Sequence, residues 1–201
     1  MCGIAGAIDR QITSEELKLG VRGMIHQLTH RGPDHLQVWS GGFVALGHTR
    51  LKILDLSDDA NQPFEYEKCF ITYNGEIYNY IELRSELERL GFQFKTKSDT
   101  EVLIASYLYW GLDCVKRFVG MWAFAIWDTA NKRLFCSRDR FGIKPFYYIR
   151  SNSAFYFGSE YKALKVSRLF DGRINLNQVN RGLFLGWSNY QDESYYEQIK
   201  V

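Results

Sequence analysis

Cys2 has both the residue type and the position for nucleophilic chemistry. It follows Met1 directly and opens the small, apolar run of residues 2–8. Removal of Met1 would give one residue a thiol and a free α-amine, which places a nucleophile and a base on the same backbone. A thiol has a pKa of about 8.5 and an α-amine one of about 7.7–8.0, so proton transfer between them costs little near neutral pH. The alternative is a small thiol buried at a strand start, which position alone favours.

Two motifs carry basic groups at the edges of expected elements. Residues 47–51 (Gly-His-Thr-Arg-Leu) end a strand-like run in Arg50, whose guanidinium could bind a carboxylate through two parallel hydrogen bonds. Residues 30–34 (His-Arg-Gly-Pro-Asp) follow the first expected helix, and their Gly-Pro pair is also a common helix stop. A lone Arg is more often a surface or salt-bridge residue, so neither motif indicates a site by itself.

Two further motifs carry amide and carboxyl groups. Residues 73–79 contain Asn74 and Gly75, a common hairpin turn that could also present a side-chain amide and a backbone N–H together as an oxyanion hole. In residues 97–101, Asp99 falls in the first turn of a helix, where the helix dipole alone explains a carboxylate. Taken together, the motifs supply a thiol, a carboxylate clamp, an oxyanion-donor pair and an extra carboxylate. These are the groups needed to hydrolyse an amino-acid side-chain amide.

As a set, the motifs resemble a known family. The chain is similar to the class II glutamine amidotransferase domain of glutamine-hydrolysing asparagine synthetases and their relatives, in family order from residue 2 to about residue 165. The matching stretches are residues 1–6, 30–34, 47–57, 62–63, 73–79, 98–101, 120–125, 138–145 and 159–164. Residues 138–145 and 159–164 have no evident acid–base role, and we expect them to be structural or to face an ammonia-using domain.

The resemblance implies a reaction at Cys2. Glutamine would be hydrolysed to glutamate and ammonia through a γ-glutamyl thioester on Cys2, whose own freed amine would be the base. Asn74 and Gly75 would be the oxyanion donors, and one such donor is typically worth about 3–4 kcal/mol. If Met1 were retained, the Cys2 nitrogen would be an amide, and we expect that form to be poorly active.

The resemblance also implies how glutamine would be held. Arg50 would bind the α-carboxylate and Asp99 the α-amine, while backbone groups around Ile53 and Glu76 would add contacts. No cofactor and no metal are implied for this chain. A degenerate domain kept as a regulatory or interaction module is an alternative, and so is the glutaminase domain of another class II amidotransferase.

Helices and strands must bring these residues together. The sequence predicts helices that start after Thr13, near Asn79 and at Ser98, and a last helix over residues 175–185. Residues 13–16 and 98–101 have the spacing of capping boxes. Strands are expected at residues 43–46 and 69–73, in a hairpin of 122–127 with 134–136, and in a hairpin of 147–149 with 155–157. Because the strands cluster around hairpin turns, the pattern favours an α+β fold with antiparallel sheets covered by helices. The resemblance implies a four-layer αββα sandwich of the N-terminal-nucleophile type.

Composition narrows the class of protein. The chain has 201 residues, 46% hydrophobic and 24% charged, with a net charge of +2. That charge is too small to indicate a nucleic-acid or membrane-surface partner, and no apolar run is long enough to span a bilayer. The four cysteines form no CxxC pair, so no zinc site or disulfide framework is predicted. A cytoplasmic location is the simplest expectation.

Two segments are expected along the chain. Residues 2–165 would form the glutaminase core, and residues 166–201 a C-terminal helix and a connection toward an ATP-dependent synthetase domain. The pyrophosphate loop of that domain is absent from this sequence, so ATP and Mg would belong to the missing domain. Glutamine and a covalently linked synthetase domain are therefore the expected partners, and a homodimer is compatible with the resemblance. Aspartate, giving asparagine, is the default ammonia acceptor, with another carboxylate or a sugar as alternatives.

Overall fold

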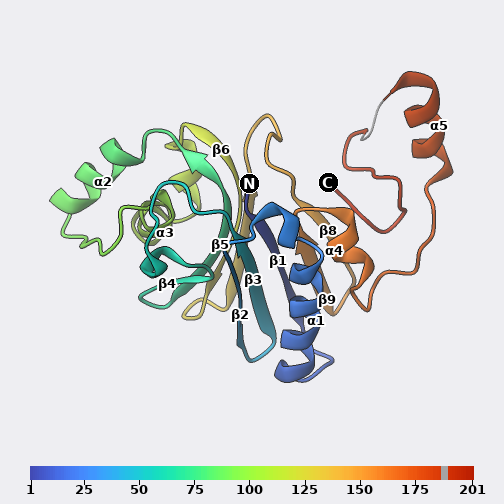
Figure 1. Ribbon diagram of the computed structural model, residues 1–201, viewed down its shortest axis with the longest axis horizontal. Coiled ribbons are helices and arrows are strands. Elements are labelled where there is room, and N and C mark those ends of the chain that lie inside the picture. The colour runs from blue at the N-terminus through green and yellow to red at the C-terminus, as the bar shows by residue number, and fades with distance from the viewer. Residues whose placement is uncertain (187–189) are drawn as a thin grey trace.

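Two antiparallel sheets lie face to face in the computed structural model, which describes residues 1–186 and 190–201 (Figure 1). The first sheet has the strand order β2-β3-β1-β9-β8, and the second has the order β4-β5-β6-β7. The strands of the first sheet are β1 (Gly3–Asp9), β2 (His35–Gly41), β3 (Val44–Arg50), β8 (Tyr147–Arg150) and β9 (Ala154–Gly158). Those of the second sheet are β4 (Phe64–Tyr66), β5 (Cys69–Ile77), β6 (Gly120–Asp128) and β7 (Arg133–Arg138).

Helices cover the outer face of each sheet. The first sheet packs against α1 (Ser14–His26) and the short α4 (Tyr161–Lys165), while α3 (Asp99–Trp110) packs on the second sheet and α2 (Tyr80–Arg89) on α3. Three apolar clusters fill the spaces between α1 and the first sheet, between the two sheets, and between the second sheet and α3. The predicted α+β fold with four layers in the order αββα is confirmed.

Helix starts were predictable because their signals are local. The Thr13 hydroxyl oxygen accepts from Glu16 N at the start of α1, and the Glu16 carboxylate accepts from Thr13 N. This capping box is therefore confirmed. Ser98 accepts from Glu101 N at the start of α3. The second capping box is incomplete, however, because the Glu101 carboxylate instead accepts from Lys95 N and Thr96 N.

Strand β6 confirms the prediction of a strand packed on both faces. Trp122, Phe124 and Ile126 face α3, while Ala123 and Ala125 face the first sheet. Both predicted hairpins, β6–β7 and β8–β9, are also present. Strand β2 was not predicted, although it pairs with β3 over its whole length.

The Asn74-Gly75 pair lies inside β5 rather than in a hairpin turn, so the turn interpretation is wrong. Strand β5 pairs with β6 continuously from Cys69↔Asp128 to Ile77↔Gly120. This long ladder outweighs the local turn preference, because each paired residue adds backbone hydrogen bonds and cross-strand side-chain contacts. The strand therefore continues four residues beyond the predicted end at residue 73.

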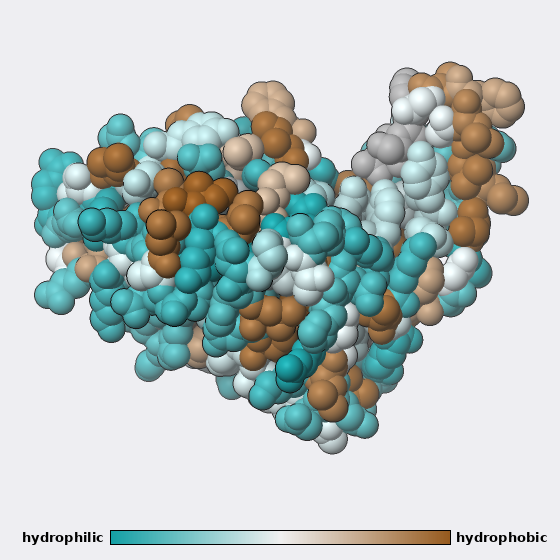
Figure 2. Space-filling model, in the orientation of Figure 1, coloured by the Kyte–Doolittle hydropathy of each residue, from teal (hydrophilic) through white to brown (hydrophobic). Residues whose placement is uncertain are grey.

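The C-terminal segment packs partly on the first sheet. Ile199 is fully buried in its core, and Lys200 exchanges backbone hydrogen bonds with Tyr148 of β8. Helix α5 (Leu176–Leu185) begins at its cap Asn175, close to the predicted last helix, and stands away from the sandwich (Figure 1). Its apolar residues, such as Phe184, cover it with hydrophobic surface (Figure 2). The polar loop predicted from residue 188 begins outside the described residues, and the boundary predicted at residue 165 stays a prediction.

Candidate active site

A small cavity of ≈ 80 Å³ lies at the ends of the two sheets, where several predicted site residues meet. Its lining includes Cys2 at the start of β1, Arg50 at the end of β3, Gly75 in β5 and Asp99 in the first turn of α3. Each of these residues comes from a different element, so only the folded sandwich brings them together. The thiol, guanidinium and carboxylate predicted from separate motifs therefore face one cavity.

The Cys2 side chain is held by the backbone of Leu51. The Leu51 N–H approaches Cys2 Sγ at 3.4 Å, and Sγ lies 3.7 Å from the Leu51 carbonyl oxygen. Burial raises the pKa of the Cys2 thiol, while the Leu51 N–H, the N-terminal charge and Arg50 act in the opposite direction. Because the net effect disfavours the thiolate, the thiol needs a nearby base to become a nucleophile.

The backbone of Cys2 is held by a half-buried arginine. Arg31 Nε donates to the Cys2 carbonyl oxygen at 2.9 Å, and Arg31 Nη1 pairs with Glu160 at 2.8 Å. His30 Nε2 lies 2.9 Å from the same carboxylate. Burial opposes ionisation of Glu160, but the hydrogen bonds from Arg31 and His30 outweigh it and hold the pKa of that carboxyl below its usual value. Residues from two motifs thus hold Cys2 in place, although neither motif was assigned this role from the sequence.

Arg50 is nearly buried and holds the loop that follows it. Its Nη1 donates to Ser57 O at 2.6 Å and to Asn61 Oδ1 at 2.7 Å, and its Nη2 donates to Asp55 O. A guanidinium has five N–H donors. Three are used by the loop and no other described residue accepts from Arg50, which leaves Nε and one Nη2 proton as a pair that can bind a carboxylate.

The Asp99 carboxylate is buried and bonded on one oxygen. Asp99 Oδ2 accepts from Tyr73 Oη at 2.7 Å and from Ile77 N at 3.0 Å. Burial raises the pKa of Asp99, and these two hydrogen bonds limit the rise. Because both of these donors reach Oδ2, no other described residue donates to Asp99 Oδ1, which can accept from a cation in the cavity.

Gly75 and Asn74 differ in their relation to the cavity. Gly75 lines it, and a Cβ at this position would collide with the backbone of Met121 and Trp122. Asn74 is paired directly opposite Ala123, whose side chain packs between the two sheets. Residues paired in this way point to the same face, so the Asn74 side chain points toward the first sheet. Asn74 is 2% exposed, and no described residue bonds its Nδ2. Asn74 is not part of the cavity lining.

The two predicted backbone contacts also differ. Ile53 lines the cavity from the loop after Arg50 and is 69% exposed. Glu76 does not line the cavity and lies opposite Met121 in the β5–β6 ladder. Tyr73, Gln62 and Thr100 do line it but were not assigned roles from the sequence. Their only sequence signal is their place within or beside the quoted motifs.

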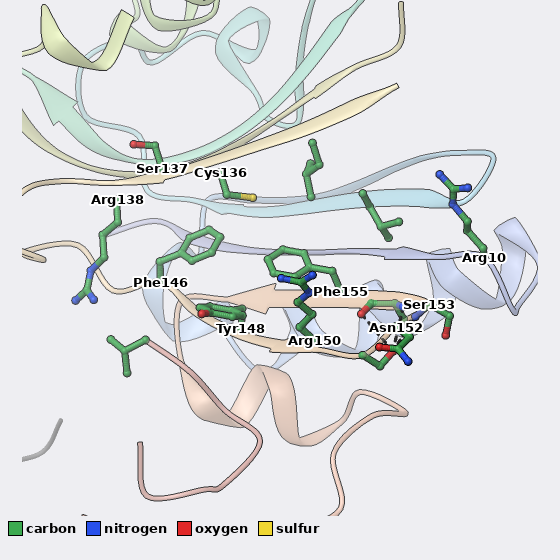
Figure 3. Close-up of a pocket in the computed structure, with 15 residues that line it drawn as sticks. Arg10, Cys136, Ser137, Arg138, Phe146, Tyr148, Arg150, Asn152, Ser153 and Phe155 are labelled. Atoms are coloured by element: carbon green, nitrogen blue, oxygen red, sulfur yellow. Dashed lines mark hydrogen bonds between the residues drawn. The ribbon is translucent and has the colours of Figure 1, made fainter. Parts of the chain in front are cut away.

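A larger groove of ≈ 810 Å³ lies between β7 and the β8–β9 hairpin (Figure 3). Its lining combines aromatic residues such as Phe146 and Phe155 with Arg10, Arg138 and Arg150, and contains no carboxylate side chain. Its one thiol, Cys136, has a pKa raised to about 12 by burial. The groove therefore lacks an activated nucleophile and an acid–base partner, despite its size.

Residues 138–145 form a loop organised by one carboxylate. The Asp139 side chain accepts from the N–H groups of Phe141, Ile143 and Lys144. This set of bonds gives Asp139 a structural role.

Among the described residues, no group of three or more His, Cys, Asp or Glu side chains could hold a metal ion. No described helix is long and apolar enough to cross a membrane.

Comparison with known proteins shows the family to which this chain belongs. A family model described as "Glutamine amidotransferase domain" matches residues 1–201, so the chain belongs to this family of glutamine amidotransferase domains. It is similar to asparagine synthetase [glutamine-hydrolyzing] 3 of Bacillus subtilis, with 39% identity over 204 residues that cover 100% of this chain and 33% of that protein. It is also similar to putative asparagine synthetase [glutamine-hydrolyzing] 2 of Methanocaldococcus jannaschii, with 39% identity covering 89% of this chain and 38% of that protein.

Solved structures confirm the fold. Glutamine phosphoribosylpyrophosphate amidotransferase of B. subtilis, complexed with ADP and GMP, superposes with a TM-score of 0.65 at 22% identity and covers 82% of this chain and 43% of that one. The fold is thus of the N-terminal-nucleophile amidotransferase type. The chain spans about a third of the length of the curated relatives it matches.

Proposed function

We propose that this chain hydrolyses glutamine to glutamate and ammonia, with Cys2 as the nucleophile. The observation that carries the proposal is the single cavity onto which the Cys2 thiol, the Arg50 guanidinium and the Asp99 carboxylate converge. An α-amino acid needs a cation for its carboxylate and an anion for its ammonium group. The cavity offers both beside a thiol, which matches an amino-acid amide as substrate.

The reaction starts with proton transfer from the Cys2 thiol to its own α-amine, once Met1 has been removed. The thiolate attacks the γ-carbonyl carbon of glutamine, and the tetrahedral oxyanion is stabilised by Asn74 Nδ2 and Gly75 N. As this intermediate collapses, the leaving amide nitrogen takes a proton from the ammonium group of Cys2 and departs as ammonia, which leaves a γ-glutamyl thioester. Water, deprotonated by the same amine, then attacks the thioester and releases glutamate and the free thiol.

Substrate binding uses groups that remain available in the structure. Arg50 binds the α-carboxylate through Nε and its remaining Nη2 proton. Asp99 Oδ1 accepts from the α-ammonium group, and backbone groups near Ile53 and Glu76 complete the site. Because these contacts are the same for substrate and transition state, they set affinity and specificity, whereas the oxyanion donors act on the rate.

The ammonia serves a second active site in a longer protein. Relatives named as glutamine-hydrolysing asparagine synthetases extend well beyond the length of this chain. We therefore propose a covalently linked, ATP- and Mg-dependent synthetase domain as the user of ammonia, with aspartate as the default acceptor and a cytoplasmic setting.

A glutaminase assay with matched cysteine variants tests the proposal. Intact mass spectrometry first establishes that Met1 is absent, and ammonia and glutamate release from glutamine is then measured for wild type, Cys2→Ala and Cys136→Ala. We expect release to be lost in Cys2→Ala and kept in Cys136→Ala, because Cys136 lies in the separate groove. Absence of Cys2-dependent release from processed protein, alone and joined to its synthetase domain, would instead favour a regulatory or interaction module.

A further inference from the structure

Tyr73 connects the two halves of the proposed site. Its hydroxyl donates to Asp99 Oδ2 at 2.7 Å, and it directly precedes Asn74 and Gly75 in β5. Tyr73 is 2% exposed and lines the cavity. One residue therefore contacts the carboxylate that would bind the α-ammonium and also belongs to the strand that would carry the oxyanion donors.

The backbone of Tyr73 is held by side chains where the sheet lacks a strand. Strand β4 pairs with β5 only from Phe64↔Ile71 to Tyr66↔Cys69, so β5 has no neighbouring strand at Tyr73 on that side. The side chains of Gln62 and His48 supply the hydrogen bonds that a neighbouring strand would otherwise make to the Tyr73 backbone. Gln62 Oε1 accepts from Tyr73 N at 2.7 Å, and His48 Nε2 donates to Tyr73 O at 3.1 Å.

These side chains are themselves fixed. Gln62 Nε2 donates to Thr100 Oγ1 at 3.1 Å, next to Asp99 in α3, and Gln62 is 5% exposed. His48 is fully buried in β3. Tyr73 thus has three anchors, at its N–H, its carbonyl oxygen and its hydroxyl, which lead to α3 and β3. An anchored donor can orient a carboxylate without the entropy loss of a mobile side chain.

We propose that Tyr73 is a positioning residue for substrate specificity, which orients the Asp99 carboxylate so that Oδ1 receives the α-ammonium group of an α-amino-acid amide. The inference rests on the proposed glutaminase function and assigns a residue to its selectivity. The Tyr73 hydroxyl donates to Oδ2 and fixes the plane of the Asp99 carboxylate. The other oxygen, Oδ1, is therefore held in one orientation toward the cavity. Without the hydroxyl, Ile77 N is the one donor that another described residue supplies to the carboxylate, so Oδ1 is no longer confined to that orientation.

The selectivity can be measured with glutamine and with glutaramate, which is glutamine without the α-amino group. Both release ammonia, but only glutamine can use Asp99. In Tyr73→Phe, we expect kcat/KM for glutamine to fall roughly 10-fold, mainly through KM, because the ammonium contact is a charged hydrogen bond. The same variant should keep kcat/KM for glutaramate within about twofold, so discrimination between the two substrates falls roughly 10-fold.

Tyr107→Phe is the matched control. The Tyr107 hydroxyl donates to Asp128 Oδ2 at 3.0 Å, so it is also a buried Tyr–Asp contact on α3, but it does not line the cavity. We expect Tyr107→Phe to keep wild-type discrimination at a comparable change in Tm. A second variant, Asp99→Asn, should abolish discrimination with either Tyr or Phe at position 73, because the positioning effect acts through the Asp99 charge.

The outcomes separate the inference from the function on which it rests. Equal losses for both substrates in Tyr73→Phe, unchanged discrimination in that variant, or the same loss in Tyr107→Phe would each overturn the positioning role while leaving the glutaminase assignment intact. Absence of Cys2-dependent ammonia release from either substrate in processed wild type would overturn the proposed function, and the inference with it.

Discussion

Replacing Asn74 by Ala should separate catalysis from stability. In the free protein, Asn74 is almost fully buried, and its Nδ2 has no acceptor among the described residues. An unsatisfied buried donor costs about 1–3 kcal/mol. Asn74→Ala removes this cost and breaks no hydrogen bond recorded for its side chain, although it loses the packing of the deleted atoms. We therefore expect the free energy of unfolding to change by less than about 1 kcal/mol.

The effect on turnover should be much larger. If Asn74 Nδ2 stabilises the oxyanion, its loss removes about 3–4 kcal/mol of transition-state stabilisation, which lowers kcat roughly 10²–10³-fold. KM should change little, because the donor acts on charge that develops only in the transition state. The assay is steady-state glutamate release, paired with urea denaturation of the same preparations.

Two results would refute this reasoning. A kcat within about threefold of wild type would show that Asn74 is not an oxyanion donor. A loss of more than about 2 kcal/mol in the free energy of unfolding would show that the side chain has a structural partner in solution. Asn61→Ala is a useful contrast, because it removes the acceptor of Arg50 Nη1 and should raise KM for glutamine instead.

Three further predictions concern the N-terminus, a buried histidine and a buried ion pair. A form that keeps Met1 behind an uncleaved N-terminal extension should lose roughly 10²–10⁴-fold in kcat, the usual contribution of a general base, and glutaminase assays on mass-verified protein would test this. Burial lowers the pKa of His48 to about 3, below its unfolded value of about 6.5, so the unfolded chain binds more protons between these values. Stability should thus fall as pH drops through this window, and His48→Gln should reduce the slope by about 1.4 kcal/mol per pH unit in urea titrations; equal slopes would contradict it. Arg168→Met leaves the fully buried Asp9 without its cation and should lower the free energy of unfolding by about 2 kcal/mol. This is less than the loss expected for a fully buried ion pair, because the Arg168 side chain is 38% exposed. Arg150→Met is the control.

The sequence was most informative where a signal is local. The capping box at Thr13 involves residues three positions apart, so its spacing can be read directly. Glu101 has the same spacing from Ser98, but its carboxylate is captured by the N–H groups of Lys95 and Thr96. The turn preference of Asn74-Gly75 also failed, because pairing with β6 is a tertiary interaction that local propensity does not contain.

The candidate site shows the same division. Cys2, Arg50 and Asp99 stand in motifs whose family resemblance implies their roles, and the fold brings all three to one cavity. Tyr73 had no such role from its motif. Its three anchoring bonds join residues 11 to 26 positions apart in the chain, and these contacts exist only once the sheets are packed. Sequence reasoning therefore predicted candidate reacting groups more readily than the residues that hold them.

The place of β1 in the first sheet has a consequence for biosynthesis. Strand β1 begins one residue after Cys2, yet one of its two neighbours is β9, with Ala5 paired to Gly158. At roughly 5–20 residues per second, a ribosome makes β9 about 8–30 s after β1. During that interval the N-terminus cannot be enclosed on both sides, and an aminopeptidase has time to remove Met1. The order of translation thus leaves Met1 accessible before the sheet that begins beside Cys2 is complete.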